Sequence, residues 1–390
     1  MERSKHLQVI IKTIERCNIN CTYCYVFNMQ DDSYLRHPAY ISQQTIGDII
    51  KFLQKGSTDL GLKHITFIFI GGEPLMQKKK DFISMCSLFN SELGKLVKVC
   101  FSVQTNGMLI DEEWISIFNN FRVGVGISLD GNKIQNDRYR VDHKNRGTYD
   151  RVASKISLMK LHYSGTISLL SVVNPENSAK EIYQHFSQDL GVKKFDFLLP
   201  DYNYENKPIN FSALDYGQFL CDLFDVWIED LASGVSIRLI GSLFNSIFFN
   251  QGSLCGQGPA RPHDLPLISI SSNGELAPMD ELRNTDPTLI LDSNTTIVSI
   301  DLKNFIAKPI FRLLDHAQME QPSACQQCCW RAVCNAGALP NRYSHAKKFD
   351  NPSLYCDGLK LYYSHVSACL LKNGYGEKEL LKQLGIHEAA

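Results

Sequence analysis

Three cysteines near the start of the chain have the type and spacing of metal ligands. Cys17, Cys21 and Cys24 form a C-x3-C-x2-C pattern directly after an apolar run, residues 7–11, that is typical of a strand. A loop at the end of that strand can place three thiolates around one face of an iron-sulfur cluster, because soft thiolates select iron-sulfur, zinc or copper(I) centres. With only three thiolates, one iron of a four-iron cluster stays open to a small molecule.

Polar turns follow three further strand-like runs. Residues 65–70 end in Gly71-Gly72-Glu73-Pro74, residues 97–103 lead into a turn that contains Gln104 and Asn106, and residues 123–129 end in Ser128-Leu129-Asp130-Gly131. Adjacent glycines let the backbone approach a ligand closely, and Glu73 supplies a carboxylate. A glycine pair by itself is most often just a turn, but successive polar turns beside a three-cysteine loop indicate one site.

Strand-like and helix-like segments alternate through the first 200 residues. The expected strands are 7–11, 65–70, 97–103, 123–129, 166–173 and 194–199, and the expected helices are 46–53, 81–93, 112–119, 149–161 and 179–190. Strands rich in β-branched and aromatic residues that alternate with helices predict parallel β-α-β units. Six strands suit an open or partial barrel, an α/β fold in which the ligand lies at the C-terminal strand ends.

The alternation stops near residue 200, where a linker or substrate-side loop (200–208) precedes a long helix over about 214–232. A hairpin is expected over residues 267–270 and 275–278, turned at Ser272-Asn273-Gly274. The C-terminal third carries a dense cysteine group.

Composition excludes several classes of protein. Forty Lys and Arg against 41 Asp and Glu give a formal charge of −1, so the balance favours neither nucleic acid nor an anionic membrane as a partner. No apolar run approaches the ~20 residues that cross a bilayer, and no signal-peptide pattern precedes residue 7. Thirteen cysteines, an odd number, indicate metal sites rather than a disulfide framework. We therefore expect a cytoplasmic protein.

These motifs resemble those of the radical S-adenosylmethionine (SAM) superfamily. The family pattern C-x3-C-x-aromatic-C is matched by Cys17, Cys21, Tyr23 and Cys24, and its GGEP motif by residues 71–74. The resemblance implies that the open iron of a [4Fe-4S] cluster chelates SAM, and that reduction releases a 5′-deoxyadenosyl radical that abstracts a hydrogen atom. The cofactor contacts that we expect come from separate strand ends: Tyr23, Gly71, Gly72, Glu73, Gln104, Asn106, Ser128, Arg140 and Leu198, with Leu199 as a neighbour.

The C-terminal cysteines resemble the SPASM extension of peptide-modifying members of this superfamily. Cys325, Cys328 and Cys334 reproduce its C-x2-C-x5-C segment, and Cys356 matches its final cysteine. The resemblance implies one auxiliary [4Fe-4S] cluster on these four residues. A structural zinc ion is the alternative, because all-cysteine zinc sites use similar spacing.

A second auxiliary cluster is not expected, because Met279 and Ala338 stand where the pattern has cysteines. Cys255 and Cys329 are then spare thiols or alternative ligands. The expected domains are a barrel over 1–205, a linker or helical segment over 206–254 and a SPASM-like domain over 255–390. Asp280 falls where related maturases carry a carboxylate proposed to take a proton from the substrate, and we expect it to act as the general base.

A narrower resemblance lies in residues 334–343 and 349–356, which look like the C-terminal signature of maturases that install cyclophane cross-links in ribosomal peptides. Asn335 and Ala336 replace two glycines of that signature. The resemblance implies a Cβ-to-aromatic-ring bond in a precursor peptide, with flavodoxin or ferredoxin as electron donor. The alternatives are thioether formation, epimerisation or sulfatase-type formylglycine formation by the same radical start, and a non-catalytic iron-sulfur or zinc scaffold.

Overall fold

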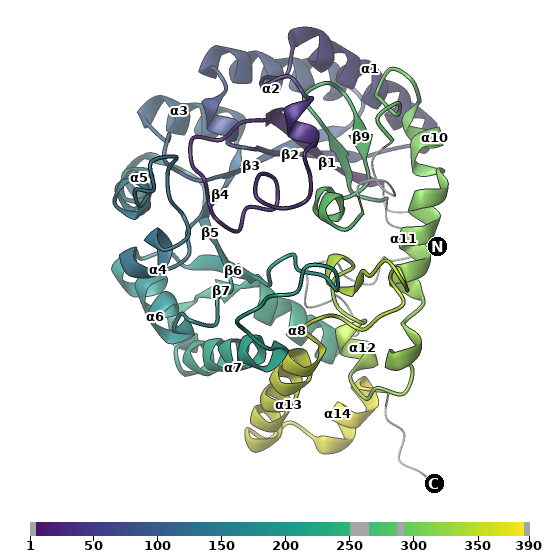
Figure 1. Cartoon of the computed structure of the whole chain (residues 1–390). Helices are drawn as coiled ribbons and strands as arrows, with labels where there is room; N and C mark the ends of the chain where they lie inside the picture. Colours follow the sequence, from purple (N-terminus) through teal and green to yellow (C-terminus); the bar gives the residue numbers. More distant parts are fainter. Residues whose placement is uncertain (1–4, 250–264, 287–291, 386–390) are drawn as a thin grey trace. The chain divides into compact units, whose positions relative to one another are not determined.

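The computed structural model describes residues 5–249, 265–286 and 292–385 (Figure 1). The chain divides into two compact units that interleave along the sequence. The first unit contains residues 1–129, 133–169 and 262–313, and the second contains residues 130–132, 170–261 and 314–390. The domain boundaries expected at residues 205 and 254 stay a prediction. Within the described ranges, no helix is both long and apolar enough to span a membrane.

A mainly parallel sheet forms the centre of the first unit. Strands β1 (His6–Ile14), β2 (His64–Gly71), β3 (Lys98–Thr105) and β4 (Gly124–Ser128) are parallel and lie in the order β4-β3-β2-β1. Beyond β1, β8 (Ile268–Ile270) is parallel to it, and β9 (Leu276–Ala277) pairs antiparallel with β8. The predicted α/β fold with a parallel sheet is confirmed, and so is the hairpin turned near residue 273.

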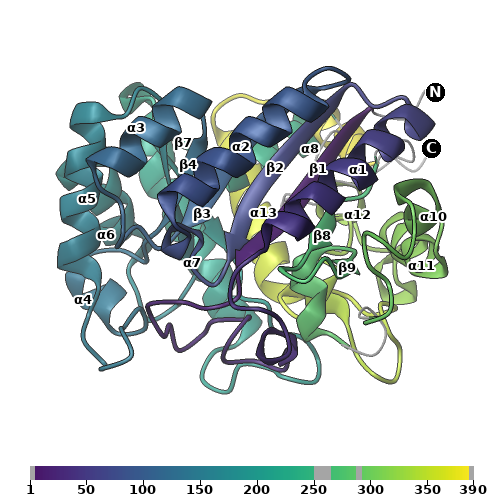
Figure 2. The same cartoon turned by 90° about the horizontal axis from the view of Figure 1, so that it is seen from above.

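Helices connect or follow the strands of this sheet. They are α1 (Gln43–Leu60), α2 (Lys79–Leu93), α3 (Glu112–Phe121), the short α4 (Lys133–Asp137), α5 (Tyr149–His162) and, later in the chain, α10 (Leu302–Ile306). Figure 2 shows α1 and α2 running along the strands β1 and β2. In α1 the Ser42 hydroxyl accepts a hydrogen bond from the Thr45 N–H, and Gly61 ends the helix in a left-handed conformation.

Aromatic side chains fill the space between the sheet and these helices. Phe67 stacks on Phe89 with ring centroids 4.3 Å apart, and Phe69 meets Phe82 edge-on at 5.0 Å. Phe82 in turn contacts Trp114 of α3 at 5.2 Å. Because close-packed cores move little, the strand ends that carry the polar turns are held in fixed positions.

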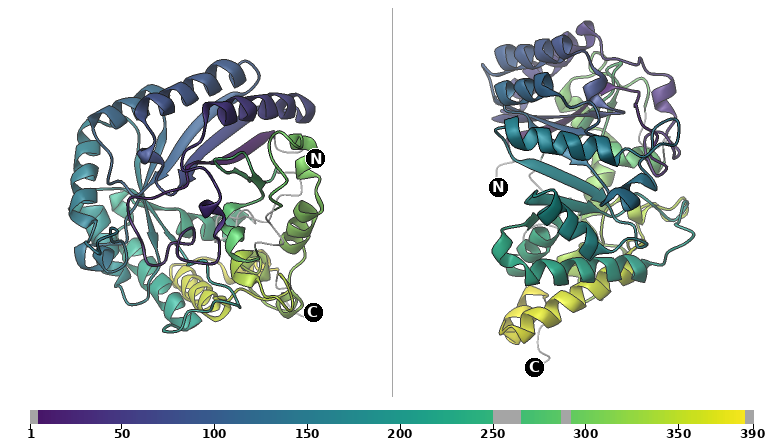
Figure 3. Two further views of the ribbon diagram at one scale, coloured as in Figure 1. Left: turned by 45° about the horizontal axis from the view of Figure 1, so that its top comes forward. Right: turned by 90° about the vertical axis from the view of Figure 1, so that its left-hand side faces the viewer.

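The second unit is mostly helical. Its strand β6 (Lys194–Leu198) pairs in parallel with β7 (Ser236–Ile237), and its helices are α6 (Ala179–Gln184), α7 (Ala213–Glu229), α8 (Arg238–Phe249), α12 (Arg331–Cys334), α13 (Cys356–Lys372) and α14 (Glu377–Gln383). Figure 3 shows α7 and α13 side by side. A Cβ atom on Gly358 would lie 1.9 Å from the Ala213 carbonyl oxygen, so this contact requires glycine.

Most predicted elements occur at the expected positions. The strand expected over 166–173 is β5 (Ile167–Val172), and the helix expected over 179–190 continues from α6 into a π-helical turn, His185–Asp189. Three helices were not predicted from the sequence: α8, α11 (Pro309–Met319) and α13. The first residue of α13 is Cys356, the expected final ligand of the C-terminal cysteine group.

Candidate active site

The loop that carries Cys17, Cys21 and Cys24 begins where β1 ends. The register of β1 against β2 shifts between Lys12 and Ile14, and such an irregularity redirects the chain at a strand end. Within the loop the N–H of Cys24 donates to the carbonyl of Cys21 at 3.0 Å. The N–H groups of Asn20 and Thr22 donate to carbonyls of residues 141 and 139. The loop is therefore held by backbone hydrogen bonds from both sides of its central cysteine.

Gly71 and Gly72 let the end of β2 lie directly against the cysteine loop. A Cβ atom on Gly71, which has φ +133°, would be 2.1 Å from the Ile14 carbonyl oxygen, and one on Gly72 would be 2.0 Å from that of Arg16. The N–H of Gly72 donates to Ile14 at 2.7 Å. From the sequence, both glycines were expected to allow close approach of a ligand; in the structure they allow close approach of the backbone at Ile14 and Arg16.

Replacing Gly72 with alanine is expected to displace the cysteine loop, at a cost of about 3 kcal/mol typical of overpacking. The variant should then lose most of the iron bound by that loop, measured by iron analysis after anaerobic reconstitution. Gly47→Ala is the matched control, since its Cβ would meet no atom within 4 Å. Because Gly47 lies inside α1, replacing it with alanine should stabilise the fold by about 0.5–1 kcal/mol. A Gly72→Ala protein with normal iron content would contradict this role.

The three thiols of the loop suit a cluster. None of them forms a disulfide in the described ranges. Burial raises the pKa of Cys17 to about 12, with further contributions from Glu73 and from the other two cysteines, so the three groups lie close enough to repel one another when ionised. A bound cationic cluster reverses that repulsion. Asn106 Nδ2 lies 3.7 Å from Cys17 Sγ and can donate to a ligating sulfur.

In the described ranges, no three His, Cys, Asp or Glu side chains, those of the cysteine loop included, are grouped closely enough to hold a single metal ion. A four-iron cluster is a larger group, and each of its cysteines binds a separate iron.

Glu73 organises the turns instead of projecting outward. Its side chain is fully buried, and it accepts hydrogen bonds from Thr105 Oγ1 at 2.6 Å, the Asn106 N–H at 2.7 Å and the Leu75 N–H at 3.0 Å. Burial raises the pKa of Glu73 above its ordinary value, although these three donors oppose the shift. Glu73 thus joins the GGEP turn to the end of β3, and its expected contact with the cofactor stays a prediction.

Two polar pairs link the remaining expected cofactor residues of the first unit. Arg140 donates to the hydroxyl of Tyr23 at 2.7 Å, and Gln104 donates to Ser128 Oγ at 2.9 Å. Arg140 is buried, so its charge lies inside the protein next to the aromatic residue of the cysteine loop. Leu198 is at the end of β6 in the second unit. The roles of these five residues in cofactor binding stay predictions.

Asp280 is buried in a network of charges that the sequence analysis did not predict. Its Oδ1 lies 2.9 Å from Lys12 Nζ and 3.0 Å from Arg283 Nε, and it accepts from Ser269 Oγ at 3.2 Å. Its Oδ2 accepts from the hydroxyl of Tyr25, the residue after Cys24, at 3.0 Å. Burial by itself raises the pKa of Asp280, but Lys12 and Arg283 outweigh it and hold the pKa below its ordinary value.

Comparisons with known proteins decide what this arrangement is. Residues 11–187 match the Radical SAM superfamily. The cysteine-type anaerobic sulfatase-maturating enzyme of Clostridium novyi (strain NT) is 26% identical over 380 residues, which cover 92% of this chain and 95% of that enzyme. The solved structure described as native anSMEcpe with bound AdoMet and Cp18Cys peptide is 25% identical, with a TM-score of 0.81 over 94% of this chain and 98% of that chain. The protein is a radical SAM enzyme.

This radical SAM enzyme is homologous to sulfatase-maturating enzymes of two kinds. A serine-type enzyme of Bacteroides thetaiotaomicron is also similar, 23% identical over 402 residues that cover 97% of this chain and 93% of that enzyme. As a radical SAM enzyme, the protein uses S-adenosylmethionine with a [4Fe-4S] cluster. Sulfatase maturation was one of the alternatives expected from sequence, and the cyclophane-specific resemblance is a finer assignment that these relatives do not support.

The four C-terminal cysteines of the radical SAM enzyme converge in the second unit. Cys325, Cys328, Cys334 and Cys356 line one pocket together with Trp330 and Lys360. Burial raises the pKa of Cys325, and the nearby Cys356 and Cys328 add to the rise. Lys360 lies one helical turn after Cys356, and that thiol raises the pKa of Lys360. Cys328 also raises the pKa of Cys356, so three of the four thiols repel one another when ionised, and a cation beside them suits a ligated, negatively charged centre.

Of the two remaining candidate thiols, Cys329 and Cys255, only Cys329 lies in the described residues. Cys329 is exposed and does not line the pocket of the four cysteines, consistent with a spare thiol. Met279 directly precedes Asp280 in the first unit, and Cys255 lies outside the described residues. The assignment of ligands stays a prediction.

Three successive residues after Cys334 adopt left-handed conformations: Asn335 at φ 48°, Ala336 at φ 61° and Gly337 at φ 78°. The cyclophane-maturase signature has glycines at these positions, and the backbone explains why. Asn and Gly tolerate this conformation, whereas alanine pays a steric cost. Arg342, also part of that signature, is buried and donates to the carbonyls of Phe349 and Ala317. The signature therefore has a structural role around the cysteine pocket.

Ala336→Gly is expected to stabilise the enzyme by about 1 kcal/mol, because it removes the cost of a left-handed alanine. Thermal unfolding of the reconstituted protein measures the change. Ala153→Gly, inside the helix α5, provides the opposite control and should destabilise by about 1 kcal/mol. An unchanged or lowered stability for Ala336→Gly would show that the strain is absent.

Proposed function

We propose that the enzyme oxidises a residue of a peptide at its β-carbon and joins that carbon to the ring of a nearby aromatic residue, giving a cyclophane. Cys17, Cys21 and Cys24 hold the cluster that binds SAM, and together these cofactors supply a 5′-deoxyadenosyl radical that takes the β-hydrogen. The peptide substrate is supported by the likeness to anSMEcpe, whose structure contains a bound peptide. A flavodoxin or ferredoxin donates the first electron.

The observation that carries the oxidation step of this proposal is the buried Asp280, whose pKa is held below its ordinary value in the same unit as the cysteine loop. The ring coupling rests on the resemblance of residues 334–343 and 349–356 to the cyclophane-forming maturases. Coupling to an aromatic ring leaves a ring carbon with an extra hydrogen, and that proton must leave before the ring regains aromaticity. Such a proton is strongly acidic, so a carboxylate with a lowered pKa is a sufficient acceptor. Lys12 and Arg283 keep Asp280 ionised, and Tyr25 holds its second oxygen towards the loop.

Sulfatase-type formylglycine formation is the second candidate. The whole-length similarity to sulfatase-maturating enzymes favours it, because 92% of the chain takes part in the match to the Clostridium novyi enzyme. Oxidation of a Cys or Ser side chain to an aldehyde also begins at the β-carbon and also releases a proton, so Asp280 can serve either reaction. The two candidates therefore differ in the peptide that is bound, not in the base.

Mass spectrometry of a co-expressed precursor peptide separates the candidates. A cyclophane is expected to have lost two hydrogen atoms and to give no backbone fragments between the joined residues. Formylglycine from Ser also loses two hydrogen atoms but fragments normally and reacts with hydrazides, and formylglycine from Cys loses its sulfur. An aldehyde product would replace the cyclophane assignment with sulfatase-type maturation.

We also propose one auxiliary [4Fe-4S] cluster on the cysteines of the second-unit pocket, where it can accept the surplus electron. Iron analysis of the reconstituted enzyme should then give about eight irons per chain, four for each cluster. About twelve irons would mean that other residues replace the cysteines missing at Met279 and Ala338. One zinc and about four irons would support the structural zinc alternative.

A further inference from the structure

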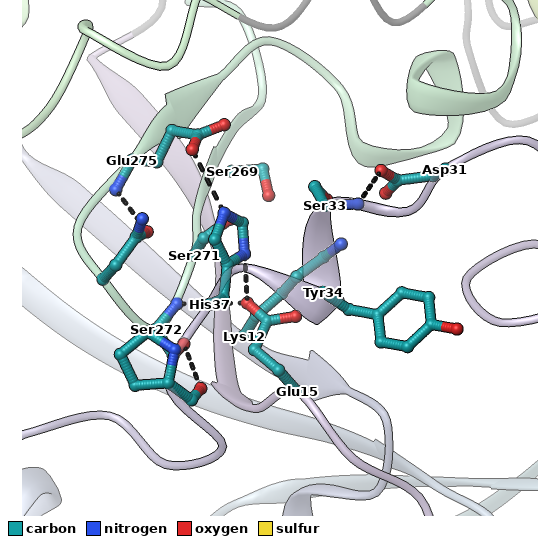
Figure 4. Close-up of polar contacts among 12 residues, drawn as sticks. Lys12, Glu15, Asp31, Ser33, Tyr34, His37, Ser269, Ser271, Ser272 and Glu275 are labelled. Atoms are coloured by element: carbon teal, nitrogen blue, oxygen red, sulfur yellow. Dashed lines mark hydrogen bonds and ion pairs between the residues drawn. The ribbon is translucent and has the colours of Figure 1, made fainter.

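Three buried ionisable side chains form a second charged group in the first unit (Figure 4). His37, in the segment between the cysteine loop and α1, lies between two carboxylates. Its Nδ1 is 3.2 Å from Glu15 Oε1, and its Nε2 is 3.1 Å from Glu275 Oε2. Their exposed fractions are 4% for His37, 0% for Glu15 and 5% for Glu275. The reaction described above uses none of them.

A carboxylate on each side favours a proton on both ring nitrogens of His37. An ionised carboxylate only accepts hydrogen bonds, and a neutral imidazole has one donor, so contacts on both sides call for imidazolium. Burial lowers the pKa of His37, but the hydrogen bonds to Glu15 and Glu275 outweigh it and raise the pKa above its ordinary value. Burial raises the pKa of Glu275, and the His37 contact overcomes this and lowers it.

His37, Glu15 and Glu275 connect the segment that leads into the cysteine loop to the hairpin that precedes Asp280. Glu15 is two residues before Cys17, and Glu275 precedes β9, after which Asp280 follows. Ser272 of the hairpin donates its N–H to Glu15 Oε1 at 3.2 Å and its hydroxyl to the Pro38 carbonyl at 2.7 Å. Glu15 Oε2 is buried and has no hydrogen-bond partner in the described residues, so His37 and the Ser272 N–H, both at Oε1, compensate the burial of that carboxylate.

Arg283 connects the three residues His37, Glu15 and Glu275 to Asp280, the proposed base. It binds Asp280, and its other nitrogens donate to Ser271 Oγ at 3.1 Å and Ser33 Oγ at 3.3 Å. The positive charge of Arg283 is a further, smaller cause of the lowered pKa of Glu275. The three cations Lys12, His37 and Arg283 thus face the three anions Asp280, Glu15 and Glu275 across the cysteine segment and the hairpin.

We propose that protonated His37 is a positioning residue that ties the start of the cysteine loop to the hairpin carrying Asp280. Without it, Glu15 and Glu275 would be two buried carboxylates facing each other, and the hairpin would move away from the loop. This inference rests on the proposed role of Asp280 as the proton acceptor, because it is the placement of that base which His37 secures.

The test compares His37→Gln with wild type in the anaerobically reconstituted full-length enzyme. Formation of 5′-deoxyadenosine should change by less than about threefold, whereas modified peptide per 5′-deoxyadenosine should fall by at least about tenfold, as misplaced reacting groups typically cause. His365→Gln is the matched control, since His365 pairs with Asp225 at 2.6 Å on a partly exposed site in the second unit. It should leave both quantities unchanged.

Thermal unfolding as a function of pH gives a readout that needs no peptide. A histidine whose pKa is raised by folding contributes stability that is complete below its unfolded pKa of about 6.5 and is lost as pH rises through the folded value. The stability advantage of wild type over His37→Gln should therefore shrink as pH increases. The same comparison for His365→Gln provides the baseline for a surface pair.

The outcomes are distinguishable. Wild-type coupling and a pH-independent stability difference in His37→Gln would overturn the proposal. If His37→Gln does not fold, the triple variant Glu15→Gln/His37→Gln/Glu275→Gln should fold, because none of its three substituted residues carries a charge. The triple variant should show the loss of coupling without the pH dependence. Wild-type coupling in the triple variant would also overturn the proposal. If wild type forms 5′-deoxyadenosine but no modified peptide, the proposed function fails, while the pH comparison still decides the state of His37.

Discussion

Replacing Cys17, Cys21 and Cys24 together with alanine is expected to abolish the formation of 5′-deoxyadenosine. The loop lies between the end of β1 and the GGEP turn, and no other described cysteine of the first unit lies in it. The iron content should fall from about eight to about four per chain, because the second-unit cysteines keep their cluster. Anaerobic assay of 5′-deoxyadenosine and iron analysis of the same sample measure both effects.

Cys86→Ala is the matched control for this variant. Cys86 is fully buried on α2, and burial raises the pKa of its thiol, as expected for a small apolar residue that binds no metal. The control should keep about eight irons and normal 5′-deoxyadenosine formation. Production of 5′-deoxyadenosine by the triple cysteine variant would show that the catalytic cluster is bound elsewhere.

Asp280→Asn is expected to separate radical formation from product formation. Modified peptide per 5′-deoxyadenosine should fall by about 10²–10⁴-fold, the usual contribution of a general base. The variant should also be destabilised by about 3–5 kcal/mol, because Lys12 and Arg283 lose their buried partner. Product analysis by mass spectrometry and denaturant unfolding measure the two effects.

Asp196→Asn controls for the stability loss. Asp196 is a buried aspartate in the second unit that forms an ion pair with Arg238 and accepts the Leu239 N–H at 2.9 Å. This variant should be destabilised while its ratio of product to 5′-deoxyadenosine stays normal. If Asp280→Asn keeps the wild-type ratio, Asp280 is a structural ion-pair partner and another group takes the proton.

The strands and their polar ends could be predicted from sequence because the signals are local. β2 is a continuous run of β-branched and aromatic residues over 65–70, and β3 has such residues at alternate positions, Val99, Phe101 and Val103. The glycines and amides that follow stand next to these strands in the chain. The structural reason for glycine at positions 71 and 72 could not be predicted from the sequence. Their close approach to Ile14 and Arg16 depends on strand pairing, which a single sequence does not display.

The charged network around Asp280 could not be predicted for the same reason. Asp280 and Lys12 are 268 positions apart, and His37 and Glu275 are 238 apart. One signal was present: Lys12 directly follows the apolar run Val9-Ile10-Ile11 inside a strand, and a buried lysine requires a partner. The left-handed Asn335 and Ala336 carried a similar signal, since glycines were expected at both positions.

The central claim is that a radical formed at the cysteine loop oxidises a peptide β-carbon and that Asp280 removes the accompanying proton. Tandem mass spectrometry of a co-expressed aromatic precursor peptide, with wild type and Asp280→Asn compared in parallel, tests it most directly. We predict a wild-type peptide that has lost two hydrogen atoms and is cross-linked from a β-carbon to an aromatic ring, and an unmodified peptide with the variant. An unmodified peptide with the wild type, despite 5′-deoxyadenosine formation, or a cross-linked peptide with both proteins would contradict the account.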